Sequence, residues 1–430
     1  MRGIRYFSHL PGTGQGDSAQ EYLSALRAAG VPVAWTPLAY GTGTWGDHYP
    51  LAPVPGPPAD EWRHRDIAGD AVDCDTAIVH STPLWPPAWA LDPGIRRLAC
   101  TTFEADRLPA RWLAILSRYD GVLVPSRHSQ RVCRDSGLSV PVTVVPHIAV
   151  PASPNPACPN PACPNPASPN PASPNPASTV SPADFGLPAH TMVFYLVATW
   201  TMRKAVPDAV RAFLNAFTAA DDVALVLKTS EHDRVALQSA GAGPHAGMSW
   251  FSLARLLAGY PAPPPIRLMT GDVGPEVIAQ LHARGDCFVS LSRGEGWNLG
   301  AFDAGAAGNP VVVTGWGGHL DYLPDGYPYC VRYDLVPTTA DAPDDWFEAE
   351  PGQRWARADI GHASSLLREI YSRRQDARRW GQLLQRHILA NFAAERITPL
   401  LLAGVAAATI RSGCDASSES SPRRADPACP

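Results

Sequence analysis

The sequence is poor in lysine and has no long apolar run, and these shortages exclude several classes of protein. Only two of its 35 basic residues are lysines. No run approaches the roughly 18 apolar residues of a transmembrane helix, and the first ten residues have no apolar segment typical of a signal peptide. The net charge of −5 argues against a nucleic-acid-binding protein. We therefore expect a protein located in the cytoplasm.

The sequence also has no Cys-x-x-Cys pair among its nine cysteines. Cys158 and Cys163 lie in a repeat, and Cys414 and Cys429 lie in a polar tail. Neither a disulfide framework nor a zinc site is indicated. Residues 73–75 match an Asp-x-Asp metal motif, but they precede an expected strand instead of following one. We expect no metal ion and no cofactor.

Two lysines remain in a chain that otherwise uses arginine, and such positions suggest a need for a compact ammonium group. Lys228 ends an expected strand at 224–228, and Lys204 follows Arg203 in the loop after an expected strand at 192–198. Ligands of open α/β sheets bind at the carboxyl ends of the strands. These three cations are therefore candidates for binding an anion.

Two stretches of the chain alternate strands and helices in the way typical of doubly wound parallel sheets. The first has expected strands at 4–9, 31–35, 76–80, 98–103, 121–125 and 142–146, a helix at 18–30 after a glycine-rich turn, and loop or insertion at 40–70. The second has expected strands at 192–198, 224–228, 266–269, 287–290 and 311–314, with a Gly/Pro-rich stretch at 241–265. Residues 354–411 are expected to be mainly helical and to cross back toward the first domain.

A proline-rich repeat separates the two stretches. Residues 151–178 contain five copies of Pro-Ala-Ser/Cys-Pro-Asn and a partial sixth. The frequent prolines favour extended or polyproline-like backbone, and nothing in the repeat is apolar enough to form a core. We predict domains at 1–150 and 180–411, a disordered linker at 151–179, and a disordered tail at 412–430.

The segment 287–323 has the most specific pattern in the chain. A buried strand leads into a turn with two glycines around Glu295, and a helix with small residues follows from Asn298. The start of a helix favours anions, so a carboxylate beside it fits only if it faces a neutral group such as a sugar diol. Asp303, about two turns along the helix, is placed for a second diol such as a ribose. The pattern predicts a nucleotide-sugar site.

This segment resembles the donor site of retaining glycosyltransferases of the GT-B fold, family 4. Their signature is Glu-x7-Glu, an Ala/Gly-rich helix, Gly-x-Pro-Val-Val and a Gly-Gly loop. The matching residues here are Glu295 and Asp303, then 308–312, then Gly317 and Gly318. The second acid departs from the signature, because Asp303 is shorter than glutamate by a methylene.

The resemblance implies a fold, an activity and partners. The fold would be α/β, with two Rossmann-like doubly wound domains facing a cleft. The activity would be transfer of a sugar from a UDP or GDP sugar to a glycan or lipid-linked acceptor, with retention of anomeric configuration. Such a role belongs to polysaccharide biosynthesis, and the departing phosphate would accept the proton of the acceptor.

The resemblance also implies roles for individual residues. An Arg and a Lys hold the leaving diphosphate in the family, and the matching residues are Arg203 and Lys228. With Glu295 these form the expected catalytic set. The expected donor-binding set is Lys204, Gly294, Gly296, Trp297, Asn298, Leu299 and Asp303.

The N-terminal domain has four further candidates. Gly14 and Gly16 lie in the first glycine-rich turn, which faces the cleft in the enzymes that this chain resembles. Those enzymes often have a histidine where this chain has Glu104, so that role cannot be carried over. Glu104 fits either a contact with sugar hydroxyls or acceptor, or a plain loop carboxylate. His80 ends a buried strand, where a structural role is the more common one.

Two alternatives remain open from the sequence. One is another nucleotide-sugar enzyme or an NAD-dependent enzyme, although a G-x-G-x-x-G turn is missing. The other is a catalytically silent GT-B module that acts as a partner or scaffold. An excess of arginines between residues 96 and 134 also leaves open a peripheral contact with anionic lipid of the inner membrane.

Overall fold

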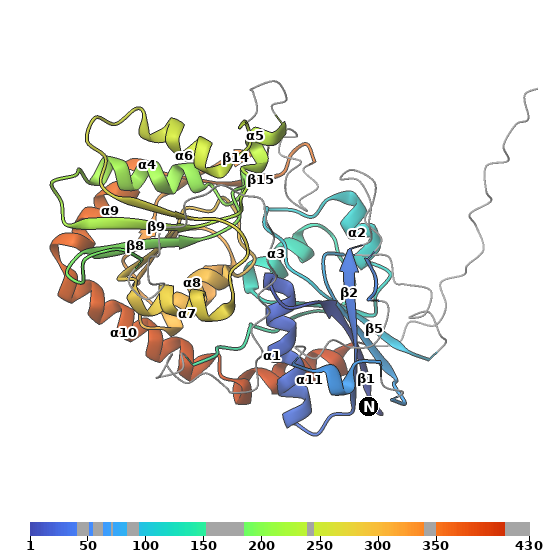
Figure 1. The fold of residues 1–430 in the computed structure, drawn as a ribbon. Coiled ribbons are helices and arrows are strands. Elements are labelled where there is room, and N and C mark those ends of the chain that lie inside the picture. The colour runs from blue at the N-terminus through green and yellow to red at the C-terminus, as the bar shows by residue number, and fades with distance from the viewer. Residues whose placement is uncertain are drawn as a thin grey trace, which may run out of the picture.

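The computed structural model describes residues 1–40, 51–54, 63–69, 72–83, 94–151, 185–238, 245–338 and 350–408, and these residues form two α/β units (Figure 1). Each unit has a central, largely parallel sheet with helices packed against it. The predicted linker, except for residue 151, and the predicted tail lie outside the described residues.

The N-terminal sheet has the strand order β3-β2-β1-β4-β5-β6-β7. All neighbours pair in parallel except β2 and β3. The strands are β1 (Ile4–His9), β2 (Val33–Tyr40), β3 (Leu51–Pro53), β4 (Thr76–His80), β5 (Arg96–Cys100), β6 (Gly121–Val124) and β7 (Val142–Val144). The prediction of loop for 40–70 was wrong for β3 and for the short 3₁₀ helix η1 (Arg65–Ile67). The three-residue β3 has no sequence period of its own, and pairing with β2 defines it.

Three helices cover this sheet: α1 (Gly14–Ala28), α2 (Ala110–Leu116) and α3 (Arg127–Asp135). Helix α1 begins four residues earlier than predicted. Thr13 caps it by accepting a hydrogen bond from the Gly16 amide at 3.0 Å. Asp17 accepts one from the Gly12 amide at 2.8 Å. These reciprocal caps offset the low helix propensity of the glycines in the first turn.

The C-terminal sheet has the order β10-β9-β8-β11-β12-β13 and is parallel throughout. Its central strands are almost fully buried, as expected when helices cover both faces. The strands are β8 (Met192–Val197), β9 (Val223–Lys228), β10 (Ile266–Met269), β11 (Cys287–Ser290), β12 (Val311–Thr314) and β13 (Cys330–Val331). An antiparallel hairpin follows, made of β14 (Tyr333–Pro337) and β15 (Arg354–Ala358).

The helices of this unit are α4 (Val206–Ala216), α5 (Arg234–Gln238), α6 (Ser249–Leu257), α7 (Pro275–Arg284), α8 (Leu299–Ala306) and the 3₁₀ helix η3 (Gly318–Tyr322). Helix α6 lies inside the stretch 241–265 that its glycines and prolines marked as irregular. The apolar residues of SWFSLARLL form the helix between those breakers, and Leu253 is buried. The glycines and prolines dominate the composition of the whole stretch, so the short periodic segment within it was not predicted as a helix.

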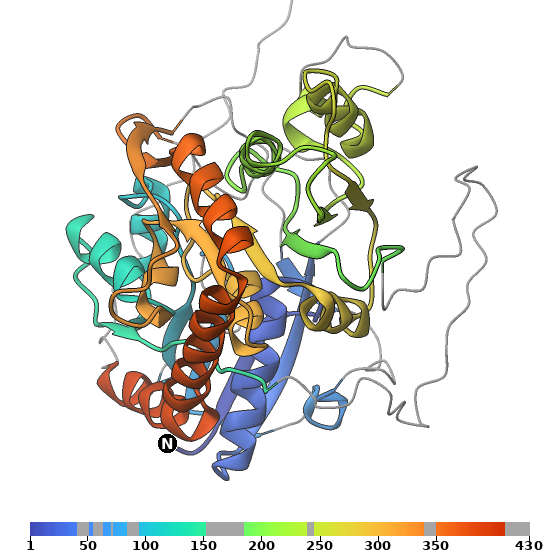
Figure 2. The same cartoon turned by 90° about the vertical axis from the view of Figure 1, so that its left-hand side faces the viewer.

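The last three helices connect the two units: α9 (Ile360–Ser372), α10 (Arg374–Asn391) and α11 (Ala394–Ala407). Helix α9 packs on α4, α10 packs on α8, and α11 contacts α1, β6 and β7 of the N-terminal unit (Figures 1 and 2). The predicted return of the chain to the first domain is confirmed. In the described part of the chain, no single helix is long and apolar enough to cross a membrane; only the bent pair α10 and α11, taken together, has the required length and composition.

An aromatic cluster beside the glycine turn joins the two units. The ring of Trp297 lies 5.1 Å from that of Tyr322, 5.5 Å from that of Phe392 and 5.6 Å from that of His147. Its side chain is buried. Since His147 comes from the N-terminal unit and Trp297 follows the glycine turn, this cluster fixes the turn relative to both sheets.

Candidate active site

Three adjacent parallel strands place the candidate cations and Glu295 at one edge of the C-terminal sheet. Lys228 is the last residue of β9, Arg203 and Lys204 follow β8, and Glu295 follows β11. Lys228 pairs in register with Val197 at the end of β8. The sequence predicted this convergence from the strand ends, and the carboxyl edge is where open α/β sheets bind ligands.

Glu295 lies in a compact ion cluster with two of the cations. Lys204 Nζ donates to Glu295 Oε1 at 2.7 Å. Arg203 Nη1 lies 3.5 Å from Glu295 Oε2 and donates to the carbonyl of Gly294 at 2.9 Å. The side chain of Glu295 is 5% exposed, that of Arg203 13% and that of Lys204 22%. The cluster is thus shielded from bulk water, which strengthens its electrostatic interactions.

The cluster keeps Glu295 ionised. Burial by itself would raise the pKa of its carboxyl, but Lys204 and Arg203 outweigh burial and hold the pKa at about 2. In contrast, burial lowers the pKa of Lys228, partly offset by the charge of Asp272. In neutral solution the edge of the sheet therefore holds an ionised carboxylate paired with Lys204 and Arg203, and Lys228 ends the strand next to β8.

Asn298 shapes the start of α8. It caps the helix with a left-handed backbone (φ 65°), and its side chain accepts from the Ala301 amide at 3.4 Å and donates to Ser290 Oγ at 3.2 Å. Asparagine is among the few residues that tolerate this conformation. Trp297 and Asn298 were both predicted to bind the donor; within the protein, Trp297 packs beside the turn and Asn298 caps the helix start. Leu299 is half-buried at the first helical position.

Gly294 and Gly296 lie at a close contact between the two units. A Cβ atom on Gly294 would overlap the carbonyl oxygen of Glu104, and one on Gly296 would overlap Thr102 Oγ1. Both partners belong to the loop after β5 in the N-terminal unit. The glycines were predicted from their place beside a helix start, and the structure adds a second reason for them, namely close contact between the units.

Asp303 lies on α8 opposite the acidic first turns of α1. The residue is exposed to solvent. Desolvation by the surrounding protein raises the pKa of the Asp303 carboxyl above its usual value, and the charges of Asp17 and Glu21 on α1 add to the effect. Water at the exposed carboxyl screens part of this repulsion.

The predicted glycines of the first turn lie at the start of α1. A Cβ atom on Gly14 would lie 3.3 Å from Leu299 Cδ1, so the beginnings of α1 and α8 face each other across the units. Gly16 is buried, and a Cβ atom there would overlap the carbonyl of Leu10. Gly14 thus lies at the contact between the two units, whereas Gly16 permits the tight turn before the helix.

His80 and Glu104 have different surroundings. His80 is buried, with Nδ1 2.9 Å from the hydroxyl of Tyr6 and Nε2 3.5 Å from Ser18 Oγ. Burial lowers its pKa well below the usual value. These contacts favour the structural role. Glu104 instead lies at the cluster, with Oε1 3.8 Å from Arg203 Nη1.

His319 is a neighbour of the site that the sequence reasoning missed. It follows the Gly-Gly loop and is buried, with Nε2 2.6 Å from the carbonyl of Thr314. The preceding amide, of Gly318, donates to the carbonyl of Glu295 at 2.7 Å. The sequence feature that could have identified His319 as a neighbour of the site is its position directly after the Gly-Gly pair.

The described residues contain no group of three or more His, Cys, Asp or Glu side chains placed to hold a metal ion. The Asp-x-Asp match at the start of β4 has other contacts. Asp75 accepts from the Arg2 amide at 2.9 Å, and Asp73 lies 3.4 Å from Arg2 Nη1. These residues hold the N-terminal segment to the sheet.

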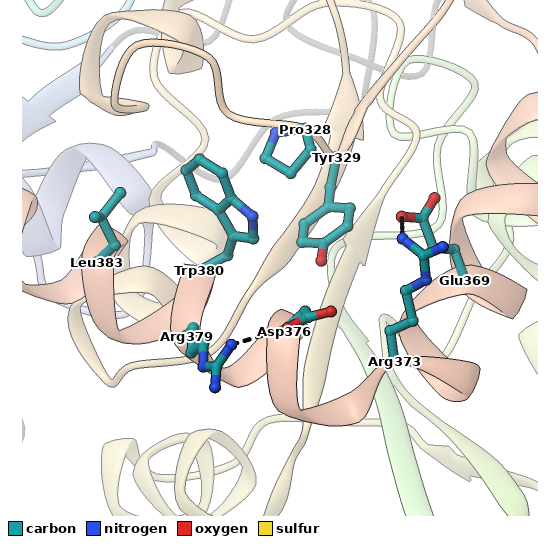
Figure 3. Close-up of a pocket in the computed structure, with 8 residues that line it drawn as sticks. All are labelled: Pro328, Tyr329, Glu369, Arg373, Asp376, Arg379, Trp380 and Leu383. Carbon is teal, nitrogen blue, oxygen red and sulfur yellow. Dashed lines mark hydrogen bonds and ion pairs between the residues drawn. The ribbon is translucent and has the colours of Figure 1, made fainter.

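A separate cavity of about 390 Å³ lies on the C-terminal unit between α9, α10 and the segment before β13 (Figure 3). Two ion pairs border it: Arg373 lies 3.8 Å from Glu369, and Arg379 lies 3.3 Å from Asp376. The described residues that line it are Pro328, Tyr329, Glu369, Arg373, Asp376, Arg379, Trp380 and Leu383, and none belongs to the ion cluster.

The fold is that of the GT-B class, with two Rossmann-like units, as solved structures of similar architecture show. Sucrose-phosphate synthase of Thermosynechococcus elongatus has a TM-score of 0.61 and 15% identity, with 94% of this chain and 98% of that chain covered. HepE of Anabaena in complex with UDP-glucose has a TM-score of 0.58 and 11% identity, covering 94% and 99%. A glycosyltransferase of Rickettsia africae has a TM-score of 0.60 and 12% identity, covering 94% and 97%.

The sequence adds evidence beyond the fold. Residues 197–349 match the family model of glycosyl transferases group 1, a segment that runs from the end of β8 past the glycine turn and α8. No curated protein sequence matches the chain. The family match and the fold together support a glycosyltransferase of the GT-B fold.

Proposed function

We propose that this protein transfers a sugar from a UDP or GDP sugar to a glycan or lipid-linked acceptor, with retention of the anomeric configuration. The observation that carries the proposal is the buried ion cluster of Glu295, Lys204 and Arg203 at the carboxyl edge of the C-terminal sheet. The matched family segment contains these three residues and Lys228. HepE, which shares the fold, was solved with UDP-glucose, and this supports a nucleotide-sugar donor here.

The cations would act on the leaving group. Arg203 and Lys228, assisted by Lys204, stabilise the negative charge that grows on the departing diphosphate, commonly the largest catalytic contribution. The free amides at the start of α8 add to this, because a helix N-terminus favours anions. The proposed transfer uses these protein cations and needs no metal ion or cofactor.

The carboxylates would hold hydroxyl groups of the donor. Glu295, which stays ionised, accepts hydrogen bonds from the sugar, and Asp303 accepts them from the ribose. In the transfer, the bond between the anomeric carbon and the phosphate oxygen breaks, and a bond to the acceptor oxygen forms on the same face. The acceptor proton passes to the departing phosphate oxygen.

The proposal extends to location and acceptor. We propose a cytoplasmic enzyme of polysaccharide biosynthesis with a peripheral contact to the inner membrane surface. Arg127, Arg131 and Arg134 are exposed and recur every three to four residues along α3, which places them on one side of that helix. Anionic lipid attracts such arginines. Co-sedimentation with vesicles that does not depend on anionic lipid would remove this part of the proposal.

Turnover of the donor tests the proposed function. The protein is incubated with UDP and GDP sugars and an oligosaccharide or lipid-linked acceptor mixture, and release of nucleoside diphosphate is followed with and without EDTA. We expect release from one nucleotide series only, unaffected by EDTA, and a product whose anomeric configuration by proton NMR equals that of the donor. An inverted product would rule out retention, and loss of release in EDTA would rule out metal-independent transfer.

A further inference from the structure

The N-terminal unit contacts the glycine turn of the candidate site through one loop, which follows β5. This loop places the carbonyl of Glu104 against Gly294 and the hydroxyl of Thr102 against Gly296, with no room for a Cβ atom at either glycine. Glu295 lies between the two glycines. One of the contacts between the units is therefore made at the proposed donor site itself.

The same loop brings a second carboxylate to Arg203. Glu104 Oε1 lies 3.8 Å from Arg203 Nη1, while Glu295 Oε2 lies 3.5 Å from the same nitrogen on the other side of the junction. Arg203 thus links carboxylates from both units. In the protein without a donor, the guanidinium proposed to bind the diphosphate already has negative partners.

The two carboxylates are held differently. Glu295 is 5% exposed and has the short hydrogen bond from Lys204 at 2.7 Å. Glu104 is 18% exposed, and its distance to Arg203 exceeds that of a hydrogen bond. A looser, more hydrated ion pair is the easier one to exchange, so Glu104 is the partner that an incoming anion can displace.

We propose that Glu104 is a positioning residue. It holds Arg203 in place in the absence of donor, and the donor diphosphate displaces Glu104 from Arg203. A diphosphate has more negative charge than one carboxylate and accepts two parallel hydrogen bonds from a guanidinium. It therefore displaces the carboxylate of Glu104 from Arg203. Glu104 lowers the apparent affinity for the donor and makes donor binding loosen one contact between the units. This inference rests on the proposed nucleotide-sugar site.

The test is the affinity of Glu104→Gln for nucleoside diphosphates. Isothermal titration calorimetry is carried out on the full chain with UDP and GDP and with the matching nucleosides, uridine and guanosine. We expect the nucleoside diphosphate that the wild type binds to bind roughly 3- to 10-fold more tightly to the variant, as the loss of a partly exposed competing charge implies. Nucleoside affinity should not change, because a nucleoside has no phosphate for Arg203.

Two variants serve as controls. Asp106→Asn removes a different ion pair of the same loop, since Asp106 Oδ2 accepts from Arg354 Nε at 2.9 Å. It should leave nucleoside diphosphate affinity at the wild-type value. Glu104→Asp keeps the negative charge and should restore affinity toward that of the wild type. Melting temperatures of all variants show whether each is folded.

Each other outcome overturns the inference in a distinguishable way. Unchanged or weaker diphosphate affinity in Glu104→Gln would contradict competition at Arg203 while leaving the proposed donor site intact. Equal tightening by Asp106→Asn, or tightening that includes the nucleoside, would show that general loosening between the units is the cause. If neither wild type nor variant binds any nucleoside diphosphate, the proposed function fails as well.

Discussion

Replacing Glu295 by glutamine is expected to lower sugar transfer by about 100-fold or more, a typical loss when one charged or hydrogen-bonding group of a preorganised site is removed. Glutamine has nearly the same volume but only one oxygen and no charge. It cannot balance Lys204 and Arg203, which lie at 2.7 and 3.5 Å, and both cations would shift relative to the leaving phosphate. The measurement is the initial rate of nucleoside diphosphate release at saturating donor.

The variant is also expected to be less stable in a pH-dependent way. Because the pKa of Glu295 is depressed to about 2, its ionisation stabilises the folded state above the unfolded pKa near 4.5, and this contribution disappears as the pH falls toward 2. The difference in melting temperature between wild type and Glu295→Gln should therefore be largest near neutral pH and shrink in acid.

A matched control separates the site from the contact between the units. Glu350 also lies between the units, where its carboxylate accepts from the Ala110 amide at 3.0 Å, but it is not part of the cluster. Glu350→Gln should keep transfer within about twofold of wild type, as expected of a site away from the chemistry. A Glu295→Gln protein that is folded and as active as wild type would contradict the role given to Glu295.

The second large effect is expected from Gly296→Ala. The added methyl group would overlap Oγ1 and Cβ of Thr102, so the glycine turn and the loop after β5 must move apart. A displacement of about 1 Å at a reacting centre can lower the rate about 100-fold. Transfer should fall by this order, while a nucleoside diphosphate, which we propose is held by the cations of the C-terminal unit, should still bind.

Gly259→Ala is the control for a glycine-to-alanine change in the same unit. A Cβ atom at Gly259 would meet only the carbonyl of Leu256 at 3.7 Å, an ordinary contact. Its rate and melting temperature should match the wild type. If Gly296→Ala retained full activity, the close contact between the units would not be needed for transfer.

The sequence carried enough information for the parts of the fold set by local pattern. The buried strands β8, β9, β11 and β12 are continuous apolar runs, and Asn298 marks the start of α8 by its capping preference. The convergence of Arg203, Lys204 and Glu295 followed from their places after parallel strands. Each of these features depends on residues that are near one another in the chain or on the general geometry of parallel sheets.

Other features depend on contacts between residues that are distant in the sequence, and these features could not be predicted from the sequence. The pairing of β3 with β2, the link from Glu104 to Arg203, and the closeness of Thr102 to Gly296 join segments far apart in the sequence. Trp297 was predicted to bind the donor from its place next to the glycine turn, and the packing of its ring between the units could not be inferred from that place. A motif gives the residue type at a position but not which side of the turn faces the ligand.

The most direct test of a nucleotide-sugar site at the cluster is the melting temperature of wild type and Lys228→Ala with UDP, GDP and their sugar conjugates. A ligand that binds only the folded state raises the melting temperature by mass action. We predict that one nucleotide series stabilises the wild type, with or without Mg²⁺, and that Lys228→Ala loses this stabilisation while remaining folded. If no nucleotide raises the melting temperature of the wild type, the donor site is contradicted and the catalytically silent GT-B module becomes the better account.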